Sequence, residues 1–129
     1  MIFLRLVIIF LFLGVGYNSI AQQFADKKYY LVDSLILGDL TIDDSVLINS
    51  SLKLYHNAVN DTDKVNAIKL IVEESWDENV YPKYNAWLYN FLKEKLKGYE
   101  GSFNNNLVLK SLSISLAGVL NNVGYIRSE

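Results

Sequence analysis

Two neighbouring segments of this chain repeat apolar residues at the spacing of an α-helix, and only a short turn separates them. The stripe of the first segment consists of Val65, Ile68, Ile71, Val72 and Trp76. The stripe of the second segment consists of Tyr84, Trp87, Leu88, Phe91, Leu92 and Leu96. Because helices joined by a short turn are antiparallel, these two stripes can face each other in a helical hairpin. We therefore expect a hairpin from Thr62 to Lys97 in which Trp76 and Trp87 lie close together.

Helix-start signals precede this hairpin and its second helix. Thr41, with Asp44 three residues later, offers a side-chain cap for an earlier helix. Asp61 or Thr62 can cap the first helix of the hairpin, and Pro82 suits the first turn of its second helix. The stripe of the earlier helix consists of Ile48, Leu52, Tyr55 and Val59.

A last helix is predicted after a loop over residues 98–106. Its stripe consists of Leu109, Leu112, Leu116, Val119, Leu120 and Val123. Gly118 and Gly124 each weaken a helix by about 1 kcal/mol relative to alanine, so we expect another backbone to approach closely there. The segment 25–37 fits either a helix or two short strands. No other segment has a convincing strand pattern, and the predicted fold class is therefore all-α.

Composition limits the chemistry that this chain can carry. Its 129 residues include no cysteine and a single histidine, which excludes disulfides, thiolate nucleophiles and cysteine-type zinc sites. The formal net charge of -2 does not indicate binding to nucleic acid or to an anionic membrane surface. We expect one small domain, no nucleic-acid partner, no cofactor and no metal site.

The first 21 residues have the organisation of a secretory signal peptide. Arg5 is followed by an apolar run from Leu6 to Gly16 and by a polar segment ending in Ser19-Ile20-Ala21. The alternative is an uncleaved anchor, although this run is much shorter than the roughly 20 residues that a spanning helix needs. Cleavage after Ala21 predicts a periplasmic or secreted protein that contacts a membrane only if the signal peptide stays attached.

The segment Leu120-Asn121-Asn122-Val123-Gly124-Tyr125-Ile126, preceded by Leu116-Ala117-Gly118, resembles the first helix of a tetratricopeptide repeat. Leu120, Val123 and Gly124 occupy the large, Leu-like and small positions of that repeat, and Arg127 stands where the family usually has tyrosine. The hairpin before it is similar to a divergent repeat. Its matching positions are Ile68, Ile71 and Val72 in the first helix and Tyr84, Leu88 and Phe91 in the second.

More narrowly, the residues from about Tyr55 to Ile126 resemble the N-terminal region of exported bacterial tetratricopeptide proteins, many of which continue into a sensor histidine kinase. The resemblance implies three parts: a signal peptide over residues 1–21, an N-terminal helical segment over 22–61, and a tetratricopeptide-like hairpin with the first helix of a further, incomplete repeat over 62–129. It also implies a scaffold without catalysis of its own. Its partner would be a protein, a peptide or a missing C-terminal part of the same protein.

The predicted interaction surface lies on the last helix, because an incomplete repeat leaves part of its apolar stripe uncovered. It consists of Leu116, Leu120, Val123 and Ile126. Neither a phosphoacceptor-histidine box nor a glycine-rich nucleotide box occurs in residues 22–129. We therefore expect a fragment of a longer sensor protein that self-associates or frays after about Leu116 when isolated.

Three groups of residues could carry chemistry but are interpreted structurally. His56 has no second histidine nearby, which favours an exposed position over a base or a ligand. Four carboxylates at a helix end match no calcium loop and are interpreted as a solvated end; they are Glu73, Glu74, Asp77 and Glu78. Four aromatic residues at helical spacing could line a groove, but core packing is favoured; they are Tyr81, Tyr84, Trp87 and Phe91.

The alternative function is a small secreted hydrolase or lytic factor. It would need a nucleophile and base, or paired carboxylates, in a cleft. A pocket that holds buried Glu74 and Glu78 against His56 would favour the hydrolase. An exposed and dispersed arrangement of these three residues would favour the scaffold.

Overall fold

The structure is a computed structural model that describes residues 24–99 and 107–126, with side chains in the last helix described up to Asn122. Within these residues the protein is all-helical, as predicted. The long helices are α3 (Ile42–Asn57), α4 (Asp61–Glu74), α5 (Tyr81–Lys97) and α6 (Leu107–Ile126). A short helix α2 (Lys27–Tyr30) and a 3-10 turn η1 (Leu37–Asp39) precede them. The predicted signal peptide lies outside the described residues.

Local side-chain chemistry sets the helix starts. The Thr41 hydroxyl accepts a hydrogen bond from the backbone N–H of Asp44 at 3.0 Å, which confirms the predicted cap of α3. Helix α4 begins one residue earlier than predicted, because the side-chain oxygen of Asn60 accepts the N–H of Asp63 at 2.8 Å. Pro82 lies in the first turn of α5, as its missing N–H allows.

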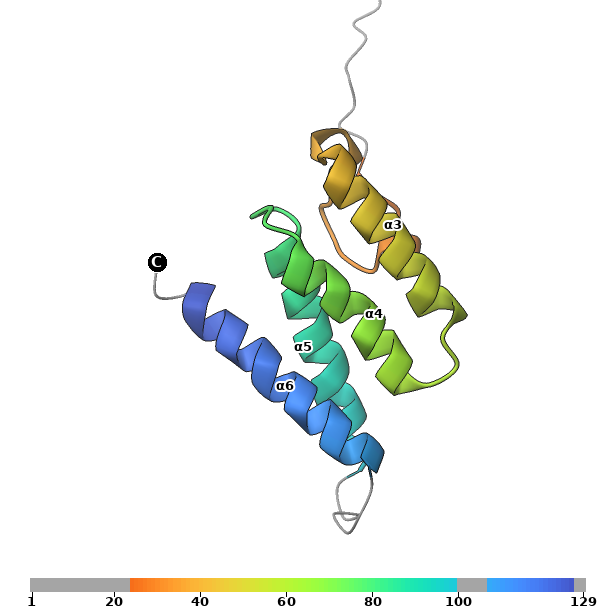
Figure 1. Ribbon diagram of the computed structural model, residues 1–129, viewed down its shortest axis with the longest axis vertical. Coiled ribbons are helices and arrows are strands. Elements are labelled where there is room, and N and C mark those ends of the chain that lie inside the picture. Colours follow the sequence, from red (N-terminus) through yellow and green to blue (C-terminus); the bar gives the residue numbers. More distant parts are fainter. Residues whose placement is uncertain (1–23, 100–106, 127–129) are drawn as a thin grey trace, which may run out of the picture.

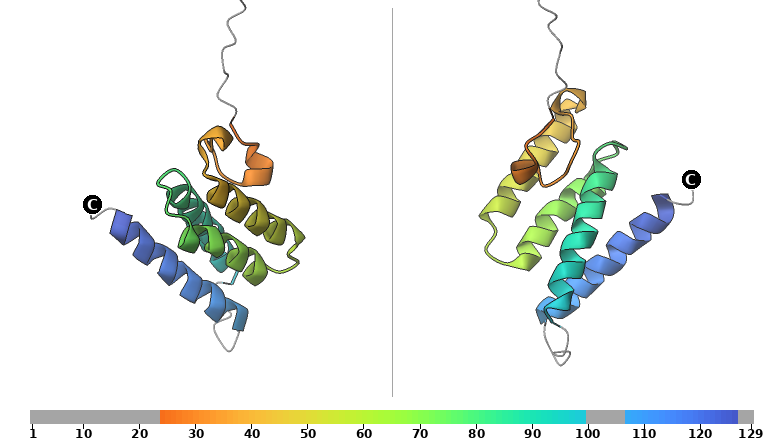
Figure 2. Two further views of the ribbon diagram at one scale, coloured as in Figure 1. Left: turned by 45° about the horizontal axis from the view of Figure 1, so that its top comes forward. Right: turned by 180° about the vertical axis from the view of Figure 1, so that it is seen from behind.

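Consecutive long helices run antiparallel and pack on one another, and α6 contacts both α4 and α5 (Figure 1). Seen from behind, α5 lies between α4 and α6 (Figure 2). The apolar stripes meet in one core whose most deeply buried members include Ile48, Leu52, Ile68, Ile71, Tyr84, Leu88, Leu92 and Leu112. Helix α4 therefore contacts each of the other three long helices, and α5 packs on α4 and α6.

The N-terminal segment forms a closed loop instead of the predicted helix or pair of strands. Only Lys27–Tyr30 is helical, and the ends of the loop meet in an isolated bridge between Phe24 and Ile36. Leu31 and Ser34 have positive φ angles of 66° and 61°, which interrupt any regular helix. The loop nevertheless buries Val32 and Leu35 against the core.

Three further predictions are wrong. Trp76 is 92% exposed and lies beyond the end of α4, so it does not meet Trp87 inside the hairpin. Val59 is 96% exposed because α3 ends at Asn57, before that position of the stripe. No atom beyond the neighbouring backbone lies within 4 Å of where a side chain at Gly118 would start, so no backbone approaches it closely. The structure does not describe the surroundings of Gly124.

The predicted face of α5 is confirmed. Tyr84, Leu88 and Leu92 are fully buried, whereas Lys93 is exposed on the other side.

No helix in the described part of the chain is long and apolar enough to span a bilayer.

Candidate functional site

A surface groove of about 410 Å³ lies where the end of α4, the α4–α5 turn and the second half of α6 come together. Its lining residues are Val72, Glu73, Ser75, Trp76, Tyr81, Asn121 and Asn122. Two of them are aromatic and three carry amide or carboxylate groups, so the groove offers both apolar contact and hydrogen bonds. We call it the α4–α6 groove.

Trp76 is the most unusual member of this groove. Its indole side chain is 92% exposed, whereas the neighbouring Tyr81 is half-buried and packs against the core. Tryptophan combines a large apolar surface with an N–H donor, and it is enriched among the residues that dominate binding energy at protein interfaces. An indole presented in this way is available to a ligand without any rearrangement of the core.

A buried hydrogen-bond network fixes the turn that carries Trp76. The Ser75 hydroxyl donates to one carboxylate oxygen of Asp44 at 2.7 Å, and the Thr41 hydroxyl donates to the other at 2.6 Å. The backbone N–H of Asp77 in turn donates to the Ser75 hydroxyl at 3.3 Å. Because Ser75 also ends α4 in an extended conformation, the helical spacing stops there and Trp76 leaves the core face. This network explains why the predicted position of Trp76 was wrong.

A second polar contact holds the α6 wall of the groove. Asn85 is 1% exposed, and its side-chain N–H donates to the backbone carbonyl of Val119 at 3.4 Å. The side-chain N–H of Asn122 donates to the Asn85 side-chain oxygen, also at 3.4 Å. Since Asn85 lies on α5, these contacts tie the α6 wall of the groove to α5.

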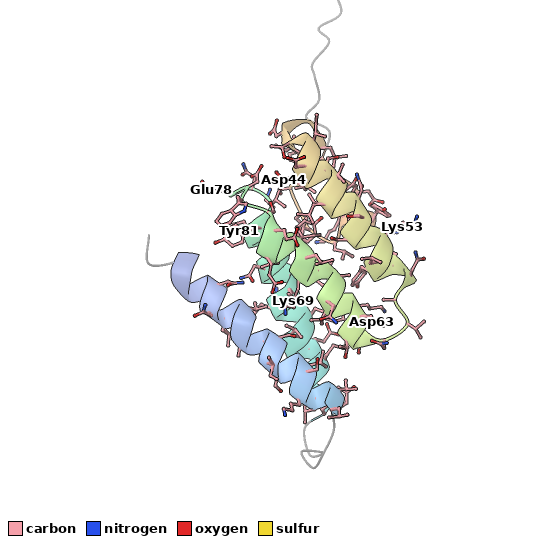
Figure 3. All side chains as sticks on the ribbon, viewed as in Figure 1. Asp44, Lys53, Asp63, Lys69, Glu78 and Tyr81 are labelled. Atoms are coloured by element: carbon pink, nitrogen blue, oxygen red, sulfur yellow. The ribbon has the colours of Figure 1, made fainter. Side chains whose placement is uncertain are left out.

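The charges around the α4–α6 groove are predominantly acidic. Glu73, Glu74 and Glu78 are exposed, and the chain has no basic residue between Lys69 and Lys83. Lys69 lies 3.4 Å from the Glu73 carboxylate, and Lys83 donates to the Ser34 carbonyl at 2.7 Å. Figure 3 shows Glu78, Asp44 and Tyr81 at the same end of the bundle. The α6 wall carries no charge, because residues 111–126 contain no ionisable acid or base other than Tyr125.

The predicted interaction surface lies beside a different hollow. Leu116 is half-buried and helps to line a space of about 340 Å³ between α5 and α6. The other lining residues are Lys93, Leu96, Lys97, Tyr99, Leu109 and Ser113. Leu120 is 49% exposed, whereas the side chains of Val123 and Ile126 lie outside the described residues. We call this space the α5–α6 hollow.

The structure does not bring His56 together with the acidic residues. His56 is exposed near the end of α3, where its ring donates through Nε2 to the Tyr29 carbonyl at 2.9 Å and stacks on the Tyr29 ring. Glu74 and Glu78 are exposed at the opposite end of the bundle, separated from His56 by the length of α4, about 20 Å. Within residues 24–99 and 107–126, no group of three potential metal ligands is arranged around a common point.

The aromatic residues of α5 are divided between core and surface. Tyr84 is fully buried, and its burial raises the pKa of its hydroxyl far above the ordinary value. Trp87 stacks on Phe91 at 5.0 Å between ring centroids and meets Tyr55 of α3 edge-on at 5.4 Å. These contacts agree with core packing of Tyr84, Trp87 and Phe91. Of the four aromatic residues, only Tyr81 lines the α4–α6 groove.

Comparison with protein-family models, with curated proteins and with solved structures finds no match for this chain.

Sequence reasoning missed the α4–α6 groove. It placed Trp76 in the core and assigned Asn121 and Asn122 no function beyond their positions in a repeat motif. A signal for Trp76 was present in the sequence, because Ser75 and Asp77 on either side of it favour the end of a helix. No local signal joined Trp76 to Asn121, since 45 residues separate them in the chain.

Proposed function

We propose that this protein is an exported helical-repeat scaffold that binds a peptide or protein segment in the α4–α6 groove. The observation that carries the proposal is the exposed Trp76 indole at a groove whose two walls are held by hydrogen bonds to the buried residues Asp44 and Asn85. A preorganised apolar anchor with polar neighbours is the usual composition of a protein-interaction hot spot.

The packing of α6 supports the repeat character of this scaffold. In helical repeats, the first helix of one repeat packs on both helices of the repeat before it. Here the contacts of α6 with both α4 and α5 support such stacking. The dispersed positions of His56, Glu74 and Glu78 support a scaffold over the hydrolase alternative.

A further part of the proposal concerns the α5–α6 hollow. Its apolar lining, with the exposed Leu120 on the same helix, suits the next helix of a repeat array in a longer sensor protein. Hydrogen exchange on the protein, with its oligomeric state measured in parallel, tests this part. Strong protection throughout residues 116–126 in a monomer would contradict it, whereas fraying or self-association would support it.

Selection from a random peptide library tests the binding function. We expect the protein to select peptides whose binding is lost in Trp76→Ala and retained in Leu54→Ala, a matched variant at an exposed apolar position on α3. Peptide binding that is unchanged in Trp76→Ala, or an absence of selected peptides, would overturn the proposed site.

The mass of the processed chain separately tests export, because removal of residues 1–21 leaves Gln22 as the first residue.

A further inference from the structure

We infer that the α4–α6 groove selects a cationic segment, with an arginine or lysine side chain placed against the Trp76 indole. This inference rests on the proposed function and specifies the chemistry of the ligand.

The indole is the strongest cation-binding ring among the natural side chains. Arginine and lysine are attracted to the face of tryptophan by its ring quadrupole, within about 6 Å of the centroid. Three lysines of this protein already lie near other rings: Lys64 near Tyr55, Lys93 near Tyr89 and Lys95 near Phe91. No cation–π contact of Trp76 occurs among those found in the described residues, so its ring is available to a guanidinium or ammonium group from a partner.

The carboxylates of the groove rim complement such a cation. Glu73 lines the groove, and Glu74 and Glu78 are exposed around the same turn. Lys69 pairs with Glu73 at 3.4 Å and Lys83 donates to the Ser34 carbonyl, whereas Glu74 and Glu78 form no ion pair within the described residues. The rim therefore attracts positive charge, and clefts with one sign of charge raise the rate at which oppositely charged ligands associate.

The other occupants fit less well. An acidic peptide would be repelled by the rim, and a purely apolar peptide would remove water from carboxylates without pairing them. The uncharged α6 wall offers the amide groups of Asn121 and Asn122, which can accept or donate hydrogen bonds to the backbone of an extended segment. A basic peptide satisfies the aromatic, acidic and amide surfaces at once.

The first test needs no peptide, because the protein contains only two tryptophans and Trp87 can be replaced. In the Trp87→Phe variant all tryptophan fluorescence comes from Trp76. We expect caesium ions to quench this fluorescence more efficiently than iodide ions, relative to free N-acetyltryptophanamide, and salt to reduce the difference. More efficient quenching by iodide would contradict an acidic environment and would overturn the inference.

The second test measures binding of two synthetic peptides of equal length, one alternating glycine with arginine and one alternating glycine with glutamate. We expect the arginine peptide alone to bind, and Trp76→Ala to weaken it by about 10-fold. Glu73→Gln should weaken it by about 3-fold, whereas Glu94→Gln, an exposed carboxylate on α5, should leave it unchanged.

The outcomes separate this inference from the proposed function. If library selection yields neutral or acidic peptides that need Trp76, the scaffold function stands and the preference for cations is wrong. If the arginine peptide binds but Trp76→Ala has no effect, binding is a general charge effect and the inference is overturned. If Trp76→Ala and Glu73→Gln both weaken the arginine peptide, the inference is supported.

Discussion

The two spaces beside α6 differ in chemistry although they share one helix. The α4–α6 groove is lined by Glu73, two asparagines and the exposed Trp76, whereas the α5–α6 hollow is lined by Leu96, Leu109 and Leu116 together with two lysines. The polar walls of the groove are held by hydrogen bonds, while the hollow is an apolar gap between packed helices. Helix α6 therefore presents amide side chains toward one space and leucine side chains toward the other.

The largest expected effect comes from the buried face of α5, which packs on both α4 and α6. Leu88→Ala on α5 should lower the free energy of unfolding by about 2 to 5 kcal/mol, because the fully buried side chain leaves a cavity. Lys93→Ala, on the exposed face of the same helix, should cost under about 0.5 kcal/mol. Urea unfolding measures both variants, and equal losses would refute the face assigned to α5.

A smaller effect should be confined to the groove side. Asp44→Ala removes the acceptor of two hydroxyl groups, Thr41 and the buried Ser75, and should cost about 1 to 3 kcal/mol. The turn that carries Trp76 should become mobile. Fluorescence anisotropy of Trp76 in the Trp87→Phe background should then fall. A stability loss without any change at Trp76 would show that the network does not position the indole.

Loss of a contact between α5 and α6 should lower the stability less than loss of the Asp44 network does. Asn122→Ala removes one side-chain hydrogen bond to the buried Asn85 and should cost about 1 kcal/mol. Hydrogen exchange should show weaker protection in α6 and unchanged protection in α4. Equal losses of protection in α4 and α6 would mean that the two walls of the groove are not stabilised independently.

The smallest expected effect is a gain in folding stability at neutral pH. The Tyr84 hydroxyl is buried and has no hydrogen-bond partner among the described residues, so Tyr84→Phe should be neutral or stabilising by up to about 1 kcal/mol. Chemical denaturation at pH 7 measures the difference. A loss above about 2 kcal/mol would show that the hydroxyl is paired in solution.

The same tyrosine gives a pH dependence with a definite sign. Burial raises the pKa of Tyr84 in the folded state, so above about pH 10 the unfolded chain releases this proton while the folded protein keeps it. The contribution of Tyr84 to stability is therefore complete below pH 10 and is lost as the pH rises further. Tyr84→Phe should reduce this alkaline loss of stability, as measured by unfolding at several pH values.

Local chemistry made much of the helical structure predictable. The Thr41 cap and the Tyr84, Leu88 and Leu92 stripe were predicted because capping and helical spacing act within a few residues. The N-terminal loop was not predictable in the same way, since it depends on a bridge between Phe24 and Ile36 and on two residues with positive φ. Of the predicted interaction surface of Leu116, Leu120, Val123 and Ile126, Leu116 lines a hollow that depends on how α5 and α6 pack.

Local residue patterns are enough to predict that this protein is helical, where most of its helices begin, and which side of α5 is buried. The position of Trp76 depends on long-range packing, because the hydrogen bond that fixes its turn joins Ser75 to Asp44 across 31 residues. The same holds for the α4–α6 groove, whose walls meet through contacts between α4, α5 and α6. Periodicity reports the face of one helix, whereas a groove depends on the distance between helices, and packing across the whole core sets that distance.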